Sequence, residues 1–233
     1  MVTLHSHATR LGVLDIGSNT VHMLIVDAAP GARPEPEAST KSTIRLMQYL
    51  KDDGSIKKAG TEALLSAVEK AMKLAEEYEI TQLLVLATSA LREAPNGGKI
   101  LRKIEEAIGQ PVTVLSGVDE ARLTFLAARR WYGWDAGRLL VIDIGGGSLE
   151  VAMGSDEDPT VALSVPAGAG RVTRTALPGV TPERTYQIVG GGLVIDEIMK
   201  ALDVKEIEIC PWALREGAIL RWLDQFGRTR LGF

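Results

Sequence analysis

Two carboxylates frame a glycine run in the middle of the chain, and together they could hold phosphate and a metal ion. Asp143 ends an apolar run, residues 145–148 read Gly-Gly-Gly-Ser, and Glu150 follows. Glycines let the backbone turn tightly and present N–H groups, which bind anions. Carboxylate oxygens are the ligands that Mg²⁺ prefers in proteins. This stretch therefore predicts a phosphate loop with a magnesium site beside it.

A second copy of this pattern lies near the N-terminus. Residues 11–20 match residues 139–148 at a constant offset, so that Asp15 corresponds to Asp143 and the turn reads Gly-Ser-Asn-Thr. Each copy runs on into another apolar strand, which predicts two similar hairpins. Such a duplication implies two lobes of like topology, which we expect at residues 1–133 and 138–233 with a hinge near 133–137. Two anion-binding turns facing each other would grip a phosphate chain from both sides.

Composition excludes some functions. The chain has 233 residues and a net charge of −4, which argues against general nucleic-acid binding. Residues 1–10 contain no apolar signal core, and no run reaches transmembrane length. The single cysteine, Cys210, fits a reducing cytoplasm. We expect a cytoplasmic enzyme with no membrane or nucleic-acid partner.

The first lobe shows the alternation of strands and helices typical of α/β proteins. Asn96 and Gly109 are expected to cap one of the helices at its start and its end. The expected strands are 11–16, 20–27, one within 43–50, 83–87 and 111–115, and the expected helices are 61–78, 97–108 and 119–132.

Two charged residues follow strand ends, where α/β sheets place their ligands. Arg92 comes shortly after the strand 83–87 and is a candidate phosphate clamp. Glu120 stands in the first turn of the helix 119–132, where a carboxylate can simply stabilise the helix dipole. It can also polarise a water molecule for attack on phosphorus. Position alone leaves both readings of Glu120 open.

The second lobe is predicted to be shorter than the first. Its elements are the hairpin 138–154, a strand 161–165, a helix 186–202, a strand 206–210 and a helix 212–226. Residues 172–184 leave no room for the helix and strand that the first lobe has between residues 47 and 96. We therefore expect an unpaired sheet edge, which costs stability unless another chain covers it.

The same residues resemble a known family. The segments 15–20, 87–92, 115–123 and 143–150 look like the exopolyphosphatase/guanosine pentaphosphate phosphohydrolase family, and 209–217 look like its actinobacterial members. The resemblance implies an α/β, actin-like fold of two ribonuclease-H-like lobes. It also implies Mg²⁺-dependent removal of terminal phosphate from linear polyphosphate, or of the 5′ γ-phosphate from guanosine pentaphosphate.

The resemblance assigns roles to individual residues. Glu120 resembles the catalytic glutamate that orients or deprotonates water, and Arg92 resembles a phosphate-contacting arginine. Asp143 and Glu150 resemble the acidic pair associated with magnesium, and Asp15 joins them through the repeat. The residues that resemble the two phosphate loops are Gly17, Ser18, Asn19, Gly145, Gly146, Gly147 and Ser148.

Three departures accompany the resemblance. Many members carry an arginine at the position of His22, and residues 45–49 replace the usual Arg-Leu-Gly-x-Gly. Members also have several tens of residues between Arg174 and Ala176 that this chain lacks.

We expect an exopolyphosphatase-like phosphohydrolase that releases terminal orthophosphate with Mg²⁺. One alternative is a non-hydrolysing relic that binds polyphosphate or guanosine tetra- or pentaphosphate. Others are a guanosine pentaphosphate hydrolase and an actin-like kinase or ATPase, although the shortened region is where an adenosine-binding loop would lie. A homodimer is compatible with the resemblance.

Overall fold

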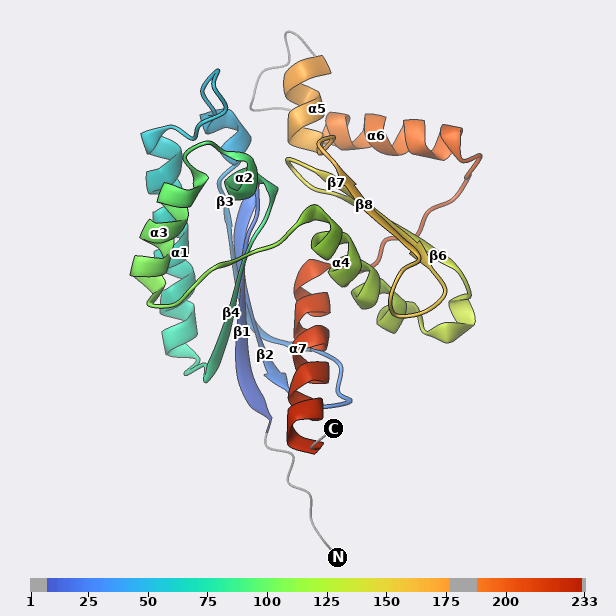
Figure 1. Ribbon diagram of the computed structural model, residues 1–233, viewed down its shortest axis with the longest axis horizontal. Helices are drawn as coiled ribbons and strands as arrows, with labels where there is room; N and C mark the ends of the chain where they lie inside the picture. The colour runs from blue at the N-terminus through green and yellow to red at the C-terminus, as the bar shows by residue number, and fades with distance from the viewer. Residues whose placement is uncertain (1–7, 177–187, 232–233) are drawn as a thin grey trace, which may run out of the picture.

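The computed structural model describes residues 8–176 and 188–231, which form two β-sheets with helices packed on them (Figure 1). In the described residues, one sheet has the strand order β3-β2-β1-β4-β5 and the other the order β6-β7-β8. The expected α/β class and the repeated hairpin are confirmed. The second sheet is the shorter one, as expected.

The first sheet is built on the N-terminal hairpin of β1 (Thr9–Ile16) and β2 (Thr20–Ala28). Strand β4 (Gln82–Ala87) runs parallel to β1, and β5 (Thr113–Val114) runs parallel to β4. Both β1 and β2 are apolar on both faces, which is typical of strands covered on both sides.

The third strand is not where the sequence placed it. Strand β3 is Pro36–Thr43 and pairs with β2, while residues Leu46–Tyr49 form a 3₁₀ turn, η1. The prediction of a strand within 43–50 was wrong because β3 is an exposed, polar edge strand without apolar alternation.

Helices cover both faces of the first sheet (Figure 1). On one face lie α1 (Lys58–Glu77) and α3 (Gly97–Ile108), which share a buried core with β1 and β2. On the other face lies α7 (Leu214–Leu231), which buries Leu214, Ala218 and Ile219 against the sheet. Gly109 ends α3 in the left-handed conformation, as predicted. Asn96 stands at the N-cap position of α3, as predicted, but its side chain binds the backbone of Ile56 and makes no capping hydrogen bond.

The second sheet consists of β6 (Leu139–Ile144), β7 (Leu149–Gly154) and β8 (Val161–Val165), all antiparallel. Helix α4 (Gly117–Tyr132) covers one face, where Phe125 and Ala121 pack on Ala152. The remaining elements are the short helix α2 (Ser89–Glu93), the 3₁₀ turn η2 (Trp134–Ala136), α5 (Ala169–Ala176) and α6 (Ile188–Ala201).

Residues 206–210 do not form the predicted strand. Along the chain, residues 206–210 come before α7 in the same way as β5 comes before α4. Strand β5 is therefore their counterpart in the first sheet. Strand β5 pairs with β4. Since the second sheet has no described counterpart of β4, residues 206–210 have no strand to pair with.

Helices α4 and α7 cross where Gly217 lies against the backbone of Leu123; a Cβ on Gly217 would lie 1.9 Å from the Leu123 carbonyl oxygen. Because α7 packs on the first sheet and α4 on the second, this crossing joins the two sheets. The lobe boundary near residues 133–137 stays a prediction. No described helix has the length and apolar character needed to span a membrane.

Candidate functional site

The two repeated turns meet at one cavity of about 320 Å³ between the sheets. Its walls come from the two turns, from strands β1, β3, β6 and β7, and from the first turns of α2, α4 and α7. Most of the predicted site residues line it: Asp15, Gly17, Ser18, Asn19, Glu120, Asp143, Gly145, Gly146, Ser148 and Glu150. The structure thus brings together residues that lie more than a hundred positions apart in the chain.

The two turns have the same backbone geometry and touch each other. Gly17 donates its N–H to the carbonyl of Thr20 at 2.9 Å, and Gly145 donates to the carbonyl of Ser148 at 3.0 Å. A Cβ on Gly146 would lie 2.3 Å from Oδ1 of Asn19. Glycine at position 146 therefore allows the loops of the two sheets to approach each other closely.

Gly147 is the predicted loop residue that does not line the cavity itself. It packs against Ser18 and Ser89, whose hydroxyl oxygens lie 3.1 Å apart. Its carbonyl accepts a hydrogen bond from Arg171 of α5 at 3.1 Å. Arg171 also pairs with Glu93 of α2, so the second loop is connected to α5 and, through Arg171, to α2.

The first turn of α4 carries two carboxylates, Asp119 and Glu120, which have different surroundings. Ser116 caps the helix by accepting a hydrogen bond from the N–H of Asp119 at 3.1 Å, and Asp119 accepts one from the Ser116 hydroxyl. Glu120 instead lines the cavity, with 6% of its surface exposed. The capping reading therefore applies to Asp119, and Glu120 is the carboxylate that faces the cleft.

Glu120 is held by Arg92, whose guanidinium donates to its carboxylate and, at 2.6 Å, to the carbonyl of Leu115. Burial raises the pKa of Glu120 to about 7, against the opposing effect of Arg92, and the charge of Glu150 adds to the rise. A carboxylate with a pKa near neutrality is suited to accept a proton from water. Arg92 is thus placed behind Glu120 and does not line the cavity directly.

The other three carboxylates lie beside the loops, where Glu150 is buried and Asp15 and Asp143 are partly buried. Asp143 accepts a hydrogen bond from Thr124 at 3.3 Å, Glu150 from Ser164 at 2.7 Å, and Asp15 from Arg215 at 3.3 Å. Burial raises the pKa of all three, that of Asp15 to about 6 against the charge of Arg215. Oδ1 of Asp15 is buried without a described partner. Buried carboxylates of this kind favour a nearby cation.

Within residues 8–176 and 188–231, no three acidic, histidine or cysteine side chains form a ready metal cluster. Mg²⁺ is commonly held by one or two carboxylates together with water and substrate phosphates, so a complete protein cage is not required. The unpartnered oxygen of Asp15 and the hard oxygen donors of Asp143 and Glu150 fit that mode of binding.

Sequence reasoning missed Arg215 and Lys41, the two cationic side chains that line the cavity. Arg215 lay within the tail segment that resembled the family, but its contact with Asp15 spans 200 residues. Lys41 is opposite His22 in the pairing of β2 with β3. Burial, and then the charges of Arg215 and Lys41, lower the pKa of His22 to about 4. Lys41 and Arg215 therefore supply the positive charge that a neutral His22 does not.

Comparison with known proteins finds a matching family model and similar sequences. The model of the Ppx/GppA phosphatase family matches residues 24–178 and 171–226. Exopolyphosphatase 1 of Mycobacterium tuberculosis is 38% identical over 304 residues, covering 92% of this chain and 88% of that protein. Exopolyphosphatase 1 of Mycobacterium leprae is 37% identical over 304 residues, covering 92% and 90%.

A solved exopolyphosphatase from Cytophaga hutchinsonii superposes with a TM-score of 0.69 and 27% identity, covering 84% of this chain. This chain spans 62% of the length of that structure. A family member from Aquifex aeolicus superposes with a TM-score of 0.63 and 23% identity, covering 85% of this chain and 63% of its own, and supports the fold. The α/β fold of these family structures is therefore shown for this chain, and the chain belongs to the Ppx/GppA phosphatase family.

Proposed function

We propose that this chain is an exopolyphosphatase-type hydrolase that releases orthophosphate from the end of linear polyphosphate. The observation that carries the proposal is the convergence of both repeated turns and Glu120 on one cavity. The names of the relatives, exopolyphosphatase in both mycobacteria, support the substrate class. The lone cysteine agrees with a cytoplasmic location for this reaction.

In the proposed reaction, backbone N–H groups of the two turns and the hydroxyls of Ser18 and Ser148 hold the terminal phosphates. Arg215 and Lys41 offset their negative charge, because the other charged side chains that line the cavity are carboxylates. Phosphoryl transfer depends chiefly on such positioning and charge stabilisation. The loops therefore fix the terminal phosphorus relative to Glu120.

Glu120 orients a water molecule and accepts its proton as the oxygen attacks the terminal phosphorus. The bond between that phosphorus and the bridging oxygen breaks, and the shortened polyphosphate leaves with the electron pair. Arg92 positions the Glu120 carboxylate and keeps part of it ionised near neutral pH. Removal of a general base typically costs 10²–10⁴-fold in rate.

Asp143, Glu150 and Asp15 would hold Mg²⁺ in this proposal. A bound Mg²⁺ neutralises charge on the phosphate oxygens. The three carboxylates line the cavity beside the loops. Because burial raises their pKa values, three negative charges there are unfavourable without a cation to compensate them.

Phosphate release from long-chain polyphosphate with Mg²⁺ tests the function. We expect release by the wild type and a loss of about 10²-fold or more in Glu120→Gln. Asp119→Asn is the matched control, because Asp119 is the neighbouring acidic residue and serves the helix cap instead of the cavity. It should keep its activity.

Guanosine pentaphosphate and ATP are the comparison substrates. Faster release from guanosine pentaphosphate than from polyphosphate would assign the alarmone as substrate. Absence of release from any of them, with binding of polyphosphate retained, would instead support a non-hydrolysing relic and contradict the proposal.

A further inference from the structure

Three polar residues form a row across the second sheet, one on each strand. Asp143 of β6 pairs with Glu150 of β7, which pairs in turn with Ser164 of β8. Residues at alternate positions along these strands share one face of the sheet. Further along, that face is apolar and packs on α4; its residues are Leu139, Val141, Ala152 and Ala162. The row is therefore the polar end of a face that otherwise belongs to the core.

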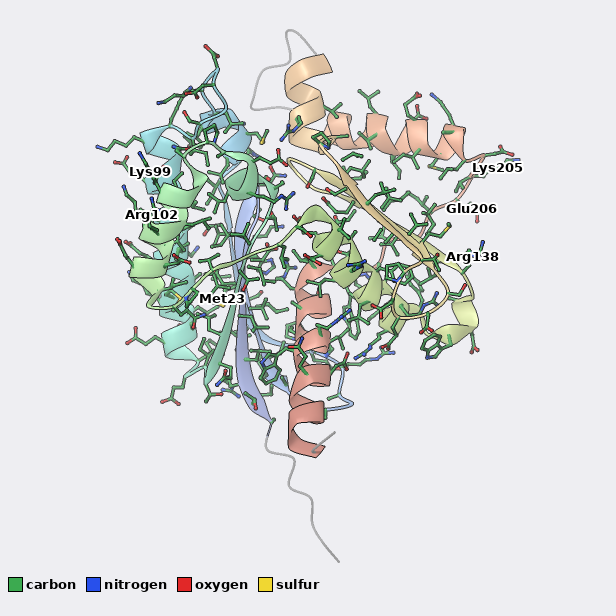
Figure 2. The ribbon with its side chains drawn as sticks, in the orientation of Figure 1. Met23, Lys99, Arg102, Arg138, Lys205 and Glu206 are labelled. Atoms are coloured by element: carbon green, nitrogen blue, oxygen red, sulfur yellow. The ribbon has the colours of Figure 1, made fainter. Side chains whose placement is uncertain are left out.

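The first sheet carries the corresponding row with different chemistry. There Asp15 pairs with His22, and His22 pairs with Lys41. Met23, labelled in Figure 2, lies in the core shared with α1 and α3, so its neighbour His22 lies on the opposite face, which α7 covers. Compared strand by strand, Ser164 stands in the second row where Lys41 stands in the first.

Ser164 holds Glu150 without adding a charge. Its hydroxyl donates to Oε1 of Glu150, with 2.7 Å between the two oxygens. Glu150 is buried and lines the cavity, whereas Ser164 does not line it. A lysine in this place would neutralise the carboxylate as an ion pair, but a hydroxyl leaves the negative charge available to a cation. Ser164 therefore acts on the cavity through Glu150.

The first residue of α4, Gly117, fixes the position of the Ser164 side chain. A Cβ on Gly117 would lie 2.3 Å from Cβ of Ser164 and 2.4 Å from its hydroxyl oxygen. Glycine at position 117 thus lets the start of the helix lie directly against the serine. Because the helix leaves the serine no room to turn toward α4, its hydroxyl stays directed at Glu150.

The same glycine also lies beside Arg92. A Cβ at position 117 would be 3.6 Å from Nη2 of Arg92, whose guanidinium binds Glu120. Two hydrogen-bonded pairs therefore meet at the start of α4, this one and the pair of Ser164 with Glu150. The start of α4 thus sets the spacing between the proposed base and the Glu150 carboxylate.

We propose that Ser164 is a positioning residue for the divalent cation, because it orients the Glu150 carboxylate that would bind the ion. The inference rests on the proposed function, which assigns Glu150 to the Mg²⁺ site. A hydrogen bond to a ligand carboxylate fixes its orientation, and loss of such a partner typically weakens metal binding about 10–100-fold. Ser164 thereby sets the affinity for the cation while contacting neither the cation nor the substrate.

Binding of Mn²⁺ to the intact chain, followed by electron paramagnetic resonance, tests this role without turnover. Mn²⁺ accepts the same oxygen ligands as Mg²⁺. We expect Ser164→Ala to bind Mn²⁺ about 10–100-fold more weakly than the wild type. Thr160→Val is the matched control, because it also removes a hydroxyl that bonds within the second sheet, to the carbonyl of Met153. It should bind Mn²⁺ as the wild type does, and circular dichroism should show both variants folded.

Two further measurements separate positioning from structural damage. Phosphate release by Ser164→Ala should need more Mg²⁺ for its half-maximal rate, yet its kcat should recover at saturating Mg²⁺. Damage to the fold would instead lower kcat at every Mg²⁺ concentration. In a Glu150→Gln background, Ser164→Ala should cause little further loss of Mn²⁺ affinity, since its effect passes through Glu150.

Unchanged Mn²⁺ affinity in Ser164→Ala would overturn the inference, and phosphate release by the wild type would still support the proposed function. Equal losses of affinity in Ser164→Ala and Thr160→Val would overturn the inference too, as would a full further loss in the Glu150→Gln background. So would a wild type that binds no Mn²⁺. Failure of the proposed function has a different signature, namely a wild type that binds Mn²⁺ but releases no phosphate from polyphosphate.

Discussion

Arg92, at the end of α2, donates a hydrogen bond to the carboxylate of Glu120, in the first turn of α4. The two residues are 28 positions apart, and the same guanidinium also binds the carbonyl of Leu115. The pair joins the first sheet to the helix that carries the proposed base. The position and the protonation of Glu120 therefore depend on Arg92.

Replacing Arg92 with alanine should shift the pH dependence of phosphate release. The Arg92 cation lowers the pKa of Glu120, so its loss raises that pKa above the present value of about 7. The acid limb of kcat/KM against pH should move upward by about 1 unit. Arg92→Lys, which keeps the charge, should shift less. An unchanged acid limb in Arg92→Ala would show that Arg92 does not influence the pKa of Glu120, which contradicts the prediction.

Glu120→Gln should stabilise the protein above neutral pH. The folded state raises the pKa of this carboxyl from its ordinary 4.5 to about 7. Because the folded protein binds the Glu120 proton more tightly than the unfolded chain does, this proton stabilises the fold fully below pH 4.5. That stabilisation is lost as the pH rises through 7. The variant should therefore gain about 1–3 kcal/mol in unfolding free energy at pH 8 and little at pH 4.5. Urea unfolding at both pH values measures this. Equal effects at both would refute the linkage.

Gly146→Ala should separate the two phosphate loops. The added Cβ would lie 2.3 Å from Oδ1 of Asn19, so the Asn19 side chain or one of the loops has to shift. We expect a loss of about 1–3 kcal/mol in stability and a strong loss of phosphate release. Gly98→Ala is the control, because a Cβ there meets nothing within 4 Å and the residue lies in α3. The control should be neutral or more stable by up to about 1 kcal/mol. Equal behaviour of both variants would contradict the close contact of the loops.

Mg²⁺ should raise the melting temperature in the presence of polyphosphate, and chelation should reverse the rise. Burial raises the pKa of Asp143, and a cation relieves the cost of ionising it there. Asp143→Asn should reduce the Mg²⁺-dependent shift while the protein stays folded. A full shift in this variant would remove Asp143 from the proposed metal ligands.

Much of the fold could be predicted because it is repeated in the sequence. The hairpins around Asp15 and Asp143 are short apolar strands joined by glycine-containing turns, and both form as expected. Strand β3 escaped prediction because its sequence, PEASTKST, has no apolar alternation and is held by pairing with β2. The opposite error occurred at 206–210, where alternating Glu and Ile suggested a strand that has no partner.

The site was predictable where its residues lie within a repeated or recognisable segment. Glu120 and both loops could be identified for that reason, and they line the same cavity. Lys41 could not be identified, since a lysine on a polar edge strand gives no signal of its own. The role of Arg215 depends on α7 crossing back to the first sheet, which is a tertiary contact that local patterns do not encode.

The most direct measurement is hydrolysis of polyphosphate in water labelled with heavy oxygen, followed by mass analysis of the released phosphate. Attack by water oriented on Glu120 predicts one labelled oxygen in each released orthophosphate from the wild type, and no labelled release above background from Glu120→Gln. Unlabelled phosphate, transfer to another acceptor, or undiminished labelled release by Glu120→Gln would contradict the account.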